Sequence, residues 1–342
     1  MQDETDQTET DDAKTTRVSA RRIAMRVFVV ALAGLLLYMA FRGVDWSELG
    51  ALLSGARAEM VLLAWLIMLS ATAVRALRWR LLLRGTTQPP YLTMFWATMA
   101  GYVGNAYLPA RAGDALRSVL LGRHLGITRS FVFGTTITER VLDTIVVVAL
   151  AGGVIAWIPQ TPGWIASAAG VLSIGAAAAL VILLAAPRLA GWIERMSARL
   201  PVRESLRAAL VHIWHEFFTG SRAIQNHGTA TAFGLLSLAV WAMDTTSILV
   251  IAGALGLTGM TPELALLLVV ALALSSVAPS TPGYVGVFQF VAVSVLGPFA
   301  IAQSEALALV LLFQGIIYLV VTPFGLIGLA VLGGLGAARA NG

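Results

Sequence analysis

The 342-residue sequence contains no cysteine, and charged residues make up only 12% of it. Without cysteine there is no disulfide, no thiolate nucleophile, no Cys-ligated zinc and no iron–sulfur cluster. The scarcity of charge comes with 58% hydrophobic residues, which is outside the usual composition of a soluble domain. Such a chain carries more apolar surface than a water-soluble core can hide, which indicates a protein of the lipid bilayer.

Lysine is almost absent as well, because Lys14 is the only one among 23 basic residues and the rest are arginine. GC-rich codon usage and an affinity for anionic lipids both explain this bias, and the sequence leaves both open. Residues 1–13 carry acidic side chains and no basic one, which is the wrong charge for a signal peptide. With little to bury, residues 1–20 are expected to form a disordered acidic tail.

Several apolar windows reach the length of about 20 residues that a helix needs to cross roughly 30 Å of hydrocarbon. Six crossings are predicted, at about 23–41, 60–83, 136–158, 164–186, 231–255 and 306–332. Arginines gather at alternate ends of these windows, for example Arg75, Arg78, Arg80 and Arg84, and by the positive-inside rule both termini are cytoplasmic. The sequence therefore predicts an all-α polytopic protein of the cell membrane, with one domain at 21–336 and a short cytoplasmic tail at 337–342.

Two segments are expected to lie along the membrane rather than across it. Residues 44–57 are short and amphipathic, and Trp46 is their interfacial anchor on the outer side. Residues 187–228 form the largest soluble segment and carry six arginines, which places them in the cytoplasm. Within this segment apolar residues recur at helical spacing opposite charged ones: Leu206, Leu210, Ile213 and Phe217. The pattern predicts an amphipathic helix, either on the inner leaflet or packed on the bundle.

Two further apolar stretches, one in each half of the chain, are interrupted by helix-breaking residues. The first interruption is 104–114 (GNAYLPARAGD), and the second is 278–286 (APSTPGYVG). Non-helical backbone leaves N–H and C=O groups unpaired, so it survives in a membrane only inside protein or beside a wet cavity. The sequence predicts two re-entrant hairpins, entering from the cytoplasm and from outside respectively, as in an inverted repeat.

Proline and glycine can also simply kink ordinary spans, and for a single break this interpretation would be preferred. Two breaks in corresponding positions, with charged residues beside one of them, favour a ligand site near the middle of the membrane. The candidate residues of the first break are Asn105, Pro109, Arg111, Gly113, Asp114 and Arg117. Those of the second break are Pro279, Ser280, Thr281, Pro282, Gly283 and Gly286.

Ionisable residues inside apolar windows add further candidates. Glu139 and Asp143 lie four residues apart, on one helical face and beside Arg140, at the entry of a predicted span. They belong either to the interior of the bundle or to an interfacial cluster, where carboxylates suit the positive end of a helix. Asp244 lies near the middle of its window, so it should pair with a residue of another helix, for which Arg111 and Arg140 are candidates.

Other chemistry finds little support in the sequence. His212, His215 and Glu216 do not have the HExxH order and lack a third ligand nearby, so no metal site is predicted. The sequence contains no phosphate-binding loop, nucleophile elbow or dinucleotide fingerprint, so neither a cofactor nor a catalytic residue is expected. The arginines flank apolar windows as the topology rule requires, which gives no reason to expect a nucleic-acid partner.

Four motifs resemble the flippase-like family also known as the lysylphosphatidylglycerol synthase transmembrane region. They are RALRWRLLL (75–83), NAYLPARAGDALR (105–117), TERVLD (138–143) and PSTPGYVGVFQ (279–289), in order within 20–335. The resemblance implies a protein that binds lipids or moves them between leaflets. The best-understood relatives also synthesise aminoacylated phosphatidylglycerol with a soluble domain. This sequence stops at Gly342, directly after the last predicted span, so synthase activity is not expected to carry over.

Two functions stay open at this point. The first is a lipid translocase without enzyme activity, in which Arg111 and Arg117 hold the headgroup of an anionic phospholipid or polyprenyl phosphate through bidentate bonds. The other candidates would line or brace its cavity. The second is a non-transporting accessory subunit that presents a lipid to a separate glycosyl- or acyltransferase, with 187–228 as the docking surface. A small-solute transporter is also compatible with two interrupted helices. The sequence does not determine the lipid, the direction of movement or the oligomeric state.

Overall fold

The computed structural model is all-helical over the residues that it describes. These are residue 31 and residues 34–340, with gaps at 85, 109–110 and 277–280 and with only 204, 211, 213, 215, 216, 219 and 220 between 198 and 221. The expected acidic tail and most of the predicted span at 23–41 lie outside the described residues. So do Leu206, Leu210, His212 and Phe217 of the predicted amphipathic helix.

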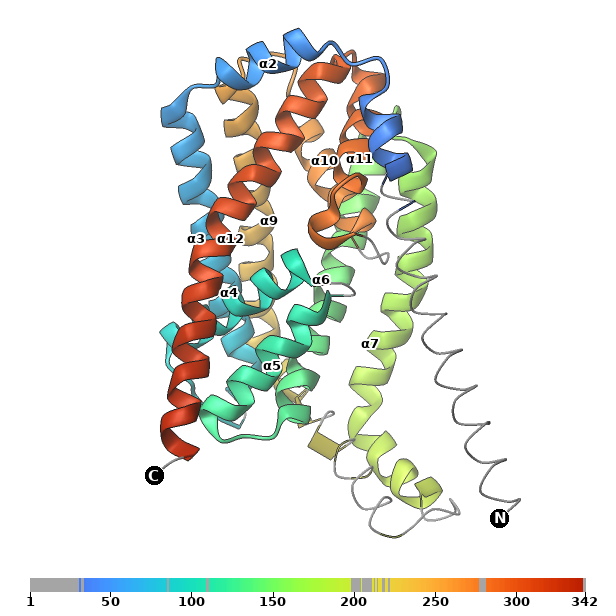
Figure 1. The fold of residues 1–342 in the computed structure, drawn as a ribbon. Coiled ribbons are helices and arrows are strands. Elements are labelled where there is room, and N and C mark those ends of the chain that lie inside the picture. The colour runs from blue at the N-terminus through green and yellow to red at the C-terminus, as the bar shows by residue number, and fades with distance from the viewer. Residues whose placement is uncertain are drawn as a thin grey trace, which may run out of the picture.

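Five long helices run between the two ends of the molecule and confirm five of the predicted crossings. They are α3 (Ala58–Leu83), α6 (Arg129–Trp157), α7 (Gly163–Ser197), α9 (His227–Ala254) and α12 (Gln303–Ala340) (Figure 1). A sixth segment that is long and apolar enough to span, Pro282–Phe299, consists of α11 and a short 3-10 turn at each end. The described part of the chain therefore has six candidate membrane spans, as a multi-pass membrane protein requires.

A short helix, α2 (Trp46–Ser54), lies across one end of the bundle (Figure 1). Asp45 caps it by accepting bonds from the backbone N–H groups of Ser47 and Glu48. Trp46 is 65% exposed, although its ring stacks on Phe41. The stretch at 44–57 thus contains a short helix, while its place at the membrane interface stays a prediction.

Two pairs of shorter helices reach the middle of the bundle from opposite ends (Figure 1). One pair is α4 (Tyr91–Tyr107) with α5 (Ala112–Leu125), and the other is α10 (Pro262–Ser275) with α11 (Val287–Leu296). At 1.5 Å per residue, the 14 residues of α5 or of α10 extend about 21 Å, which is less than the thickness of the hydrocarbon. Their re-entry into a bilayer and their relation as an inverted repeat stay predictions.

Both interruptions exist, but the first is shorter than predicted. The helix α4 continues through Tyr107 and α5 begins at Ala112, so Asn105, Gly113 and Asp114 lie in helices rather than in the break. Arg111 at this turn has a left-handed backbone, with φ 54°. A non-glycine residue in this conformation costs on the order of 1–3 kcal/mol and is typical of functional sites.

The second interruption has its own left-handed residues. A 3-10 turn at Pro282–Tyr284 separates α10 from α11, and Gly283 and Tyr284 have φ values of 67° and 60°. The Thr281 hydroxyl donates to the Val285 carbonyl oxygen at 2.6 Å and closes the turn. Pro109, Pro279 and Ser280 lie outside the described residues, so their predicted roles are not tested.

Close glycine contacts hold α4 against α5. A Cβ atom on Gly113 would lie 1.9 Å from the Gly101 carbonyl oxygen, and one on Gly104 would lie 2.6 Å from the Gly113 Cα. Small residues let helix backbones approach closely, which is a main source of helix association inside membranes. Gly113 was predicted to line a ligand site, but its position assigns it to this helix contact instead.

Gly113→Ala is therefore expected to destabilise the protein, because the added methyl group forces α4 and α5 apart, and such overpacking costs about 1–3 kcal/mol. Gly170→Ala in α7 is the matched control, since no atom lies within 4 Å of the position of its added Cβ. Thermal unfolding of the purified proteins in detergent should show a clear drop for the first variant and little change for the second. Equal unfolding temperatures would contradict the close α4–α5 contact.

Candidate functional site

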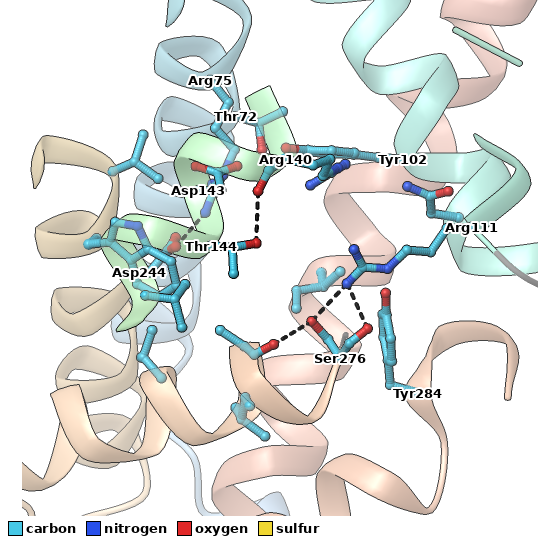
Figure 2. A pocket seen from close by; sticks show the side chains of 18 of the residues that line it. Thr72, Arg75, Tyr102, Arg111, Arg140, Asp143, Thr144, Asp244, Ser276 and Tyr284 are labelled. Carbon is cyan, nitrogen blue, oxygen red and sulfur yellow. Dashed lines mark hydrogen bonds and ion pairs between the residues drawn. The ribbon is translucent and has the colours of Figure 1, made fainter. Parts of the chain in front are cut away.

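A cavity of about 640 Å³ lies inside the bundle, at the place where the two interruptions meet. Residues of α3, α4, α6, α7, α9, α10, α11 and α12 line it. Its main polar lining residues are Thr72, Arg75, Arg78, Tyr102, Asn105, Arg111, Arg140, Asp143, Thr144, Asp244, Ser276 and Gln314 (Figure 2). Most of the other lining residues are aliphatic or aromatic. Apolar walls with a few convergent polar groups are typical of ligand pockets.

Arg78 of α3 is buried and binds two carboxylates of α6. Its guanidinium donates to Glu139 at 3.1 Å, to both oxygens of Asp143 at 2.5 and 2.8 Å, and to the Ser237 hydroxyl at 3.1 Å. The ring of Phe233 covers its outer face, 4.9 Å from the guanidinium carbon. Charges at membrane depth persist only with partners, so these contacts fix α3, α6 and α9 relative to one another.

Arg117 of α5 is the second buried arginine of this network. Its Nη2 donates to Glu139 at 2.7 Å, and its guanidinium carbon lies 4.3 Å from the centre of the Trp79 ring. Arg117 is 1% exposed and does not line the cavity. This position corrects the prediction that Arg117 grips a headgroup, because the side chain is enclosed between Glu139 and Trp79. Its charge instead helps to hold Glu139 in the interior.

Arg140 of α6 and Asp114 of α5 form a bidentate ion pair beside this cluster. The two bonds measure 2.7 and 3.0 Å, and Asn105 of α4 donates to the same carboxylate at 3.3 Å. Arg140 and Asn105 line the cavity, whereas Asp114 lies behind them. The pair therefore fixes the orientation of a cationic group that faces the cavity.

The start of α6 decides between the two interpretations of the carboxylates on this helix. The helix begins at Arg129, earlier than the predicted residue 136, so Glu139 and Asp143 lie several turns inside it. Glu139 is only 2% exposed. The alternative of an interfacial charge cluster at a helix start is therefore wrong, and the interpretation that places them inside the bundle holds.

Asp244 of α9 forms an ion pair with Arg75 of α3, and both residues line the cavity near Asp143 (Figure 2). The prediction that Asp244 pairs with another helix is confirmed, but its partner is neither Arg111 nor Arg140. From the sequence, Arg75 and Arg78 were interpreted as the positive flank of a span and as part of a family motif, but not as residues of the site. The apolar residues that continue on both sides of them were the signal that they lie inside the helix.

Arg111 makes no ion pair with a carboxylate among the described residues. Its Nη2 donates to the Ser276 carbonyl oxygen at 2.6 Å and to the Ser276 hydroxyl at 3.0 Å (Figure 2). Ser276 directly follows the last residue of α10, so the guanidinium sits at the negative end of that helix dipole. One interruption thus contacts the other through Arg111.

Two glutamines satisfy the unwound backbone of the second interruption. Gln314 donates to the Gly283 carbonyl oxygen at 2.5 Å and accepts from Gln289 at 2.6 Å. The side-chain oxygen of Gln289 accepts the Gly286 N–H at 2.7 Å. A Cβ on Gly283 would lie 1.7 Å from the hydroxyl oxygen of Tyr318, so only glycine fits there. Protein groups thus satisfy the backbone at Gly283 and Gly286, while Pro282 and Val285 of the same turn are exposed.

The structure brings part of the predicted set to the cavity. The predicted residues that line it are Asn105, Arg111, Arg140, Asp143, Asp244 and Gly283. Those that lie behind it or form its turns are Gly113, Asp114, Arg117, Glu139, Thr281, Pro282 and Gly286. Tyr102, Ser276 and Tyr284 line the cavity too but were not among the predicted site residues; Tyr284 lies in the second interruption, whereas Tyr102 and Ser276 lie outside the motifs. Within the described residues, no group of three or more metal-ligating side chains is present.

The shared ion pairs predict that Glu139 matters more for stability than Asp143. Glu139→Gln takes from buried Arg117 its only carboxylate within 3 Å among the described residues and from Arg78 one of its two carboxylates, and loss of one partner of a buried pair costs about 3–5 kcal/mol. Asp143→Asn should cost less, because that side chain is 21% exposed and pairs with one arginine. Thermal unfolding in detergent should rank the wild type first, Asp143→Asn second and Glu139→Gln last. A Glu139→Gln protein as stable as the wild type would refute the shared ion pair.

Comparison with known proteins gives two matches. Residues 24–325 match the family model of the lysylphosphatidylglycerol synthase TM region. The glycosyltransferase AglD of Haloferax volcanii is 26% identical over 332 residues, covering 84% of this chain and 52% of the relative. The chain thus spans about half the length of the curated relative that it matches. Since the family model covers most of the chain, the protein belongs to the lysylphosphatidylglycerol synthase TM region family.

Proposed function

We propose that the protein is a lipid translocase of the cell membrane, without enzyme activity, that holds an anionic headgroup in its central cavity. The observation that supports this proposal most directly is that Arg111 faces the cavity and has no carboxylate partner among the described residues. The family and the relative described above support a function connected with membrane lipids. Both termini are placed in the cytoplasm, in keeping with the distribution of arginine.

The cavity suits a headgroup better than a whole lipid. Its volume of about 640 Å³ falls within the range of about 300–1,000 Å³ that is usual for small-molecule pockets. Arg75, Arg78 and Arg140 line it, but each already binds a carboxylate. A phosphate would therefore be attracted mainly to Arg111, while the apolar walls exclude water. The acyl chains would stay in the bilayer.

Movement of the lipid would require one half of the bundle to rock against the other, as in transporters with broken helices. Polar contacts join the two halves in the centre. They include the Arg75–Asp244 ion pair, the Arg78–Ser237 bond, the Arg111–Ser276 bonds and a hydrogen bond of 2.8 Å between the hydroxyl groups of Tyr107 and Thr322. A headgroup that draws Arg111 away from Ser276 would loosen this junction, which connects binding to movement.

Arg111→Gln is expected to slow the transfer of a fluorescent anionic phospholipid between the leaflets of reconstituted vesicles about tenfold. A hydrogen bond to a charged group contributes about 1.5–3 kcal/mol, and 1.4 kcal/mol corresponds to a factor of ten. Arg57→Gln is the matched control, because Arg57 likewise donates to a carbonyl near a helix end, that of Gly253, but away from the cavity. Transfer by Arg111→Gln at the wild-type rate would contradict the proposal.

A second candidate function is an accessory subunit that presents a lipid to a glycosyl- or acyltransferase. It is favoured by one observation, namely that the chain resembles about half of a longer protein named a glycosyltransferase. Purification in mild detergent separates the two candidates. A stoichiometric transferase partner, together with no lipid transfer by this chain alone, would favour the accessory function. Lipid transfer by the purified chain would favour the translocase.

A further inference from the structure

The charges around the cavity do not balance within the described part of the chain. The cavity and the network behind it contain five arginines, Arg75, Arg78, Arg111, Arg117 and Arg140. They contain four carboxylates, Asp114, Glu139, Asp143 and Asp244. Since arginine is always charged, the group carries one excess positive charge when the carboxylates are ionised.

The excess charge can be assigned to one residue. Asp244 pairs with Arg75, and Asp114 forms its bidentate pair with Arg140. The remaining two carboxylates, Glu139 and Asp143, neutralise Arg78 and Arg117. Arg111 is left with the Ser276 carbonyl and hydroxyl, which are neutral groups at the end of a helix dipole of about half a charge.

The geometry of Arg111 also leaves room for a ligand. Both of its hydrogen bonds to described residues use a single nitrogen, Nη2, so Nε and Nη1 make none there. Tyr102, Asn105 and Tyr284 also line the cavity, and Figure 2 shows Tyr284 beside the guanidinium. The N–H groups of Nε and Nη1 lie on different edges of the guanidinium, so each can donate separately to an oxygen of a phosphodiester.

The size of the excess charge limits the chemistry of the headgroup. Unbalanced charge is costly at membrane depth, so the ligand that completes the cavity should bring one negative charge. A phosphodiester has one, whereas a phosphomonoester has about −1.5 to −2 at pH 7. A zwitterionic phosphodiester has no net charge, and its ammonium group would compete with arginines for the existing carboxylates.

We propose that the cavity selects a phosphodiester headgroup of net charge −1 over both phosphomonoester and zwitterionic lipids. The inference rests on the proposed function in placing a lipid headgroup in the cavity, and it deepens that function by naming the headgroup class. It decides against a polyprenyl phosphate, which is a monoester, as the preferred ligand. Arg111 is then the residue that determines specificity.

The test is competition binding to the purified full-length chain in nanodiscs, read by native mass spectrometry. Equal amounts of phosphatidylglycerol, phosphatidylethanolamine and phosphatidic acid with the same acyl chains are the probes. The wild type is expected to retain phosphatidylglycerol about tenfold over each competitor, as one uncompensated charge implies. Wild-type binding of phosphatidic acid equal to or tighter than that of phosphatidylglycerol would overturn the inference.

Two variants should move this preference in opposite directions. Arg111→Gln removes the excess charge, so the preference for phosphatidylglycerol over phosphatidylethanolamine should disappear, while Arg111→Lys should keep it. Asp244→Asn raises the excess positive charge around the cavity by one. The preference should therefore shift towards phosphatidic acid, which carries more negative charge than phosphatidylglycerol. Unfolding cannot produce both shifts, and Arg57→Gln should leave the preference unchanged. An Arg111→Gln protein that still prefers phosphatidylglycerol would overturn the inference.

The outcomes separate this inference from the proposed function. Lipid binding without charge preference, accompanied by transfer between leaflets, would overturn the headgroup selectivity and leave the translocase intact. Absence of both lipid binding and transfer would overturn the two together. Transfer of phosphatidylglycerol that falls about tenfold in Arg111→Gln, with the binding preference lost in parallel, would support both.

Discussion

The buried carboxylate of Glu139 is the interaction on which the arrangement of the cavity depends. It accepts hydrogen bonds from Arg78 of α3 and Arg117 of α5, so three helices are fixed around one charge. In a low-dielectric interior none of these groups is stable without the others, and the cluster must assemble as a whole. Once it does, Asp143 and Arg140 on the same helix are held at the cavity wall in fixed orientations.

The two interruptions are complementary, and each supplies what the other needs. At the left-handed turn, the Arg111 guanidinium binds the carbonyl and the hydroxyl of Ser276, directly after α10. The glutamines of α11 and α12 satisfy the backbone of the second turn, and Gly283 allows Tyr318 to approach it. Among the described residues of the second turn, Gly283 and Gly286 are thus satisfied by protein groups, as a broken helix inside a membrane would require. These contacts also make the centre of the bundle the place where both halves of the chain meet.

Inside the bundle, the arginines that have a carboxylate partner and Arg111, which has none among the described residues, have different functions. The paired arginines connect helices and hold carboxylates in place, so their loss should appear first as lost stability. Arg111 contributes little to that network, because its partners are neutral, and its free donors face the cavity. A cavity whose positive and negative charges were equal in number would not attract an anion electrostatically. In the proposed function, one excess charge would give the cavity both its affinity for an anion and its limit of a single negative charge.

The sequence by itself determined the helical membrane fold, five of the described spans and the positions of both interruptions, because hydropathy and helix breaking are local properties. It also identified most of the carboxylates of the site, since charges stand out in apolar windows. Only the tertiary structure decided the partners. Arg75 and Arg78 look like topology signals in the sequence, and Arg117 looks like a ligand contact, because the positive-inside rule counts arginines without regard to the direction of their side chains. Packing of α6 against α3 and α5, and of α3 against α9, assigned a counter-charge to four arginines and left Arg111 to the cavity, and no local pattern contains that assignment.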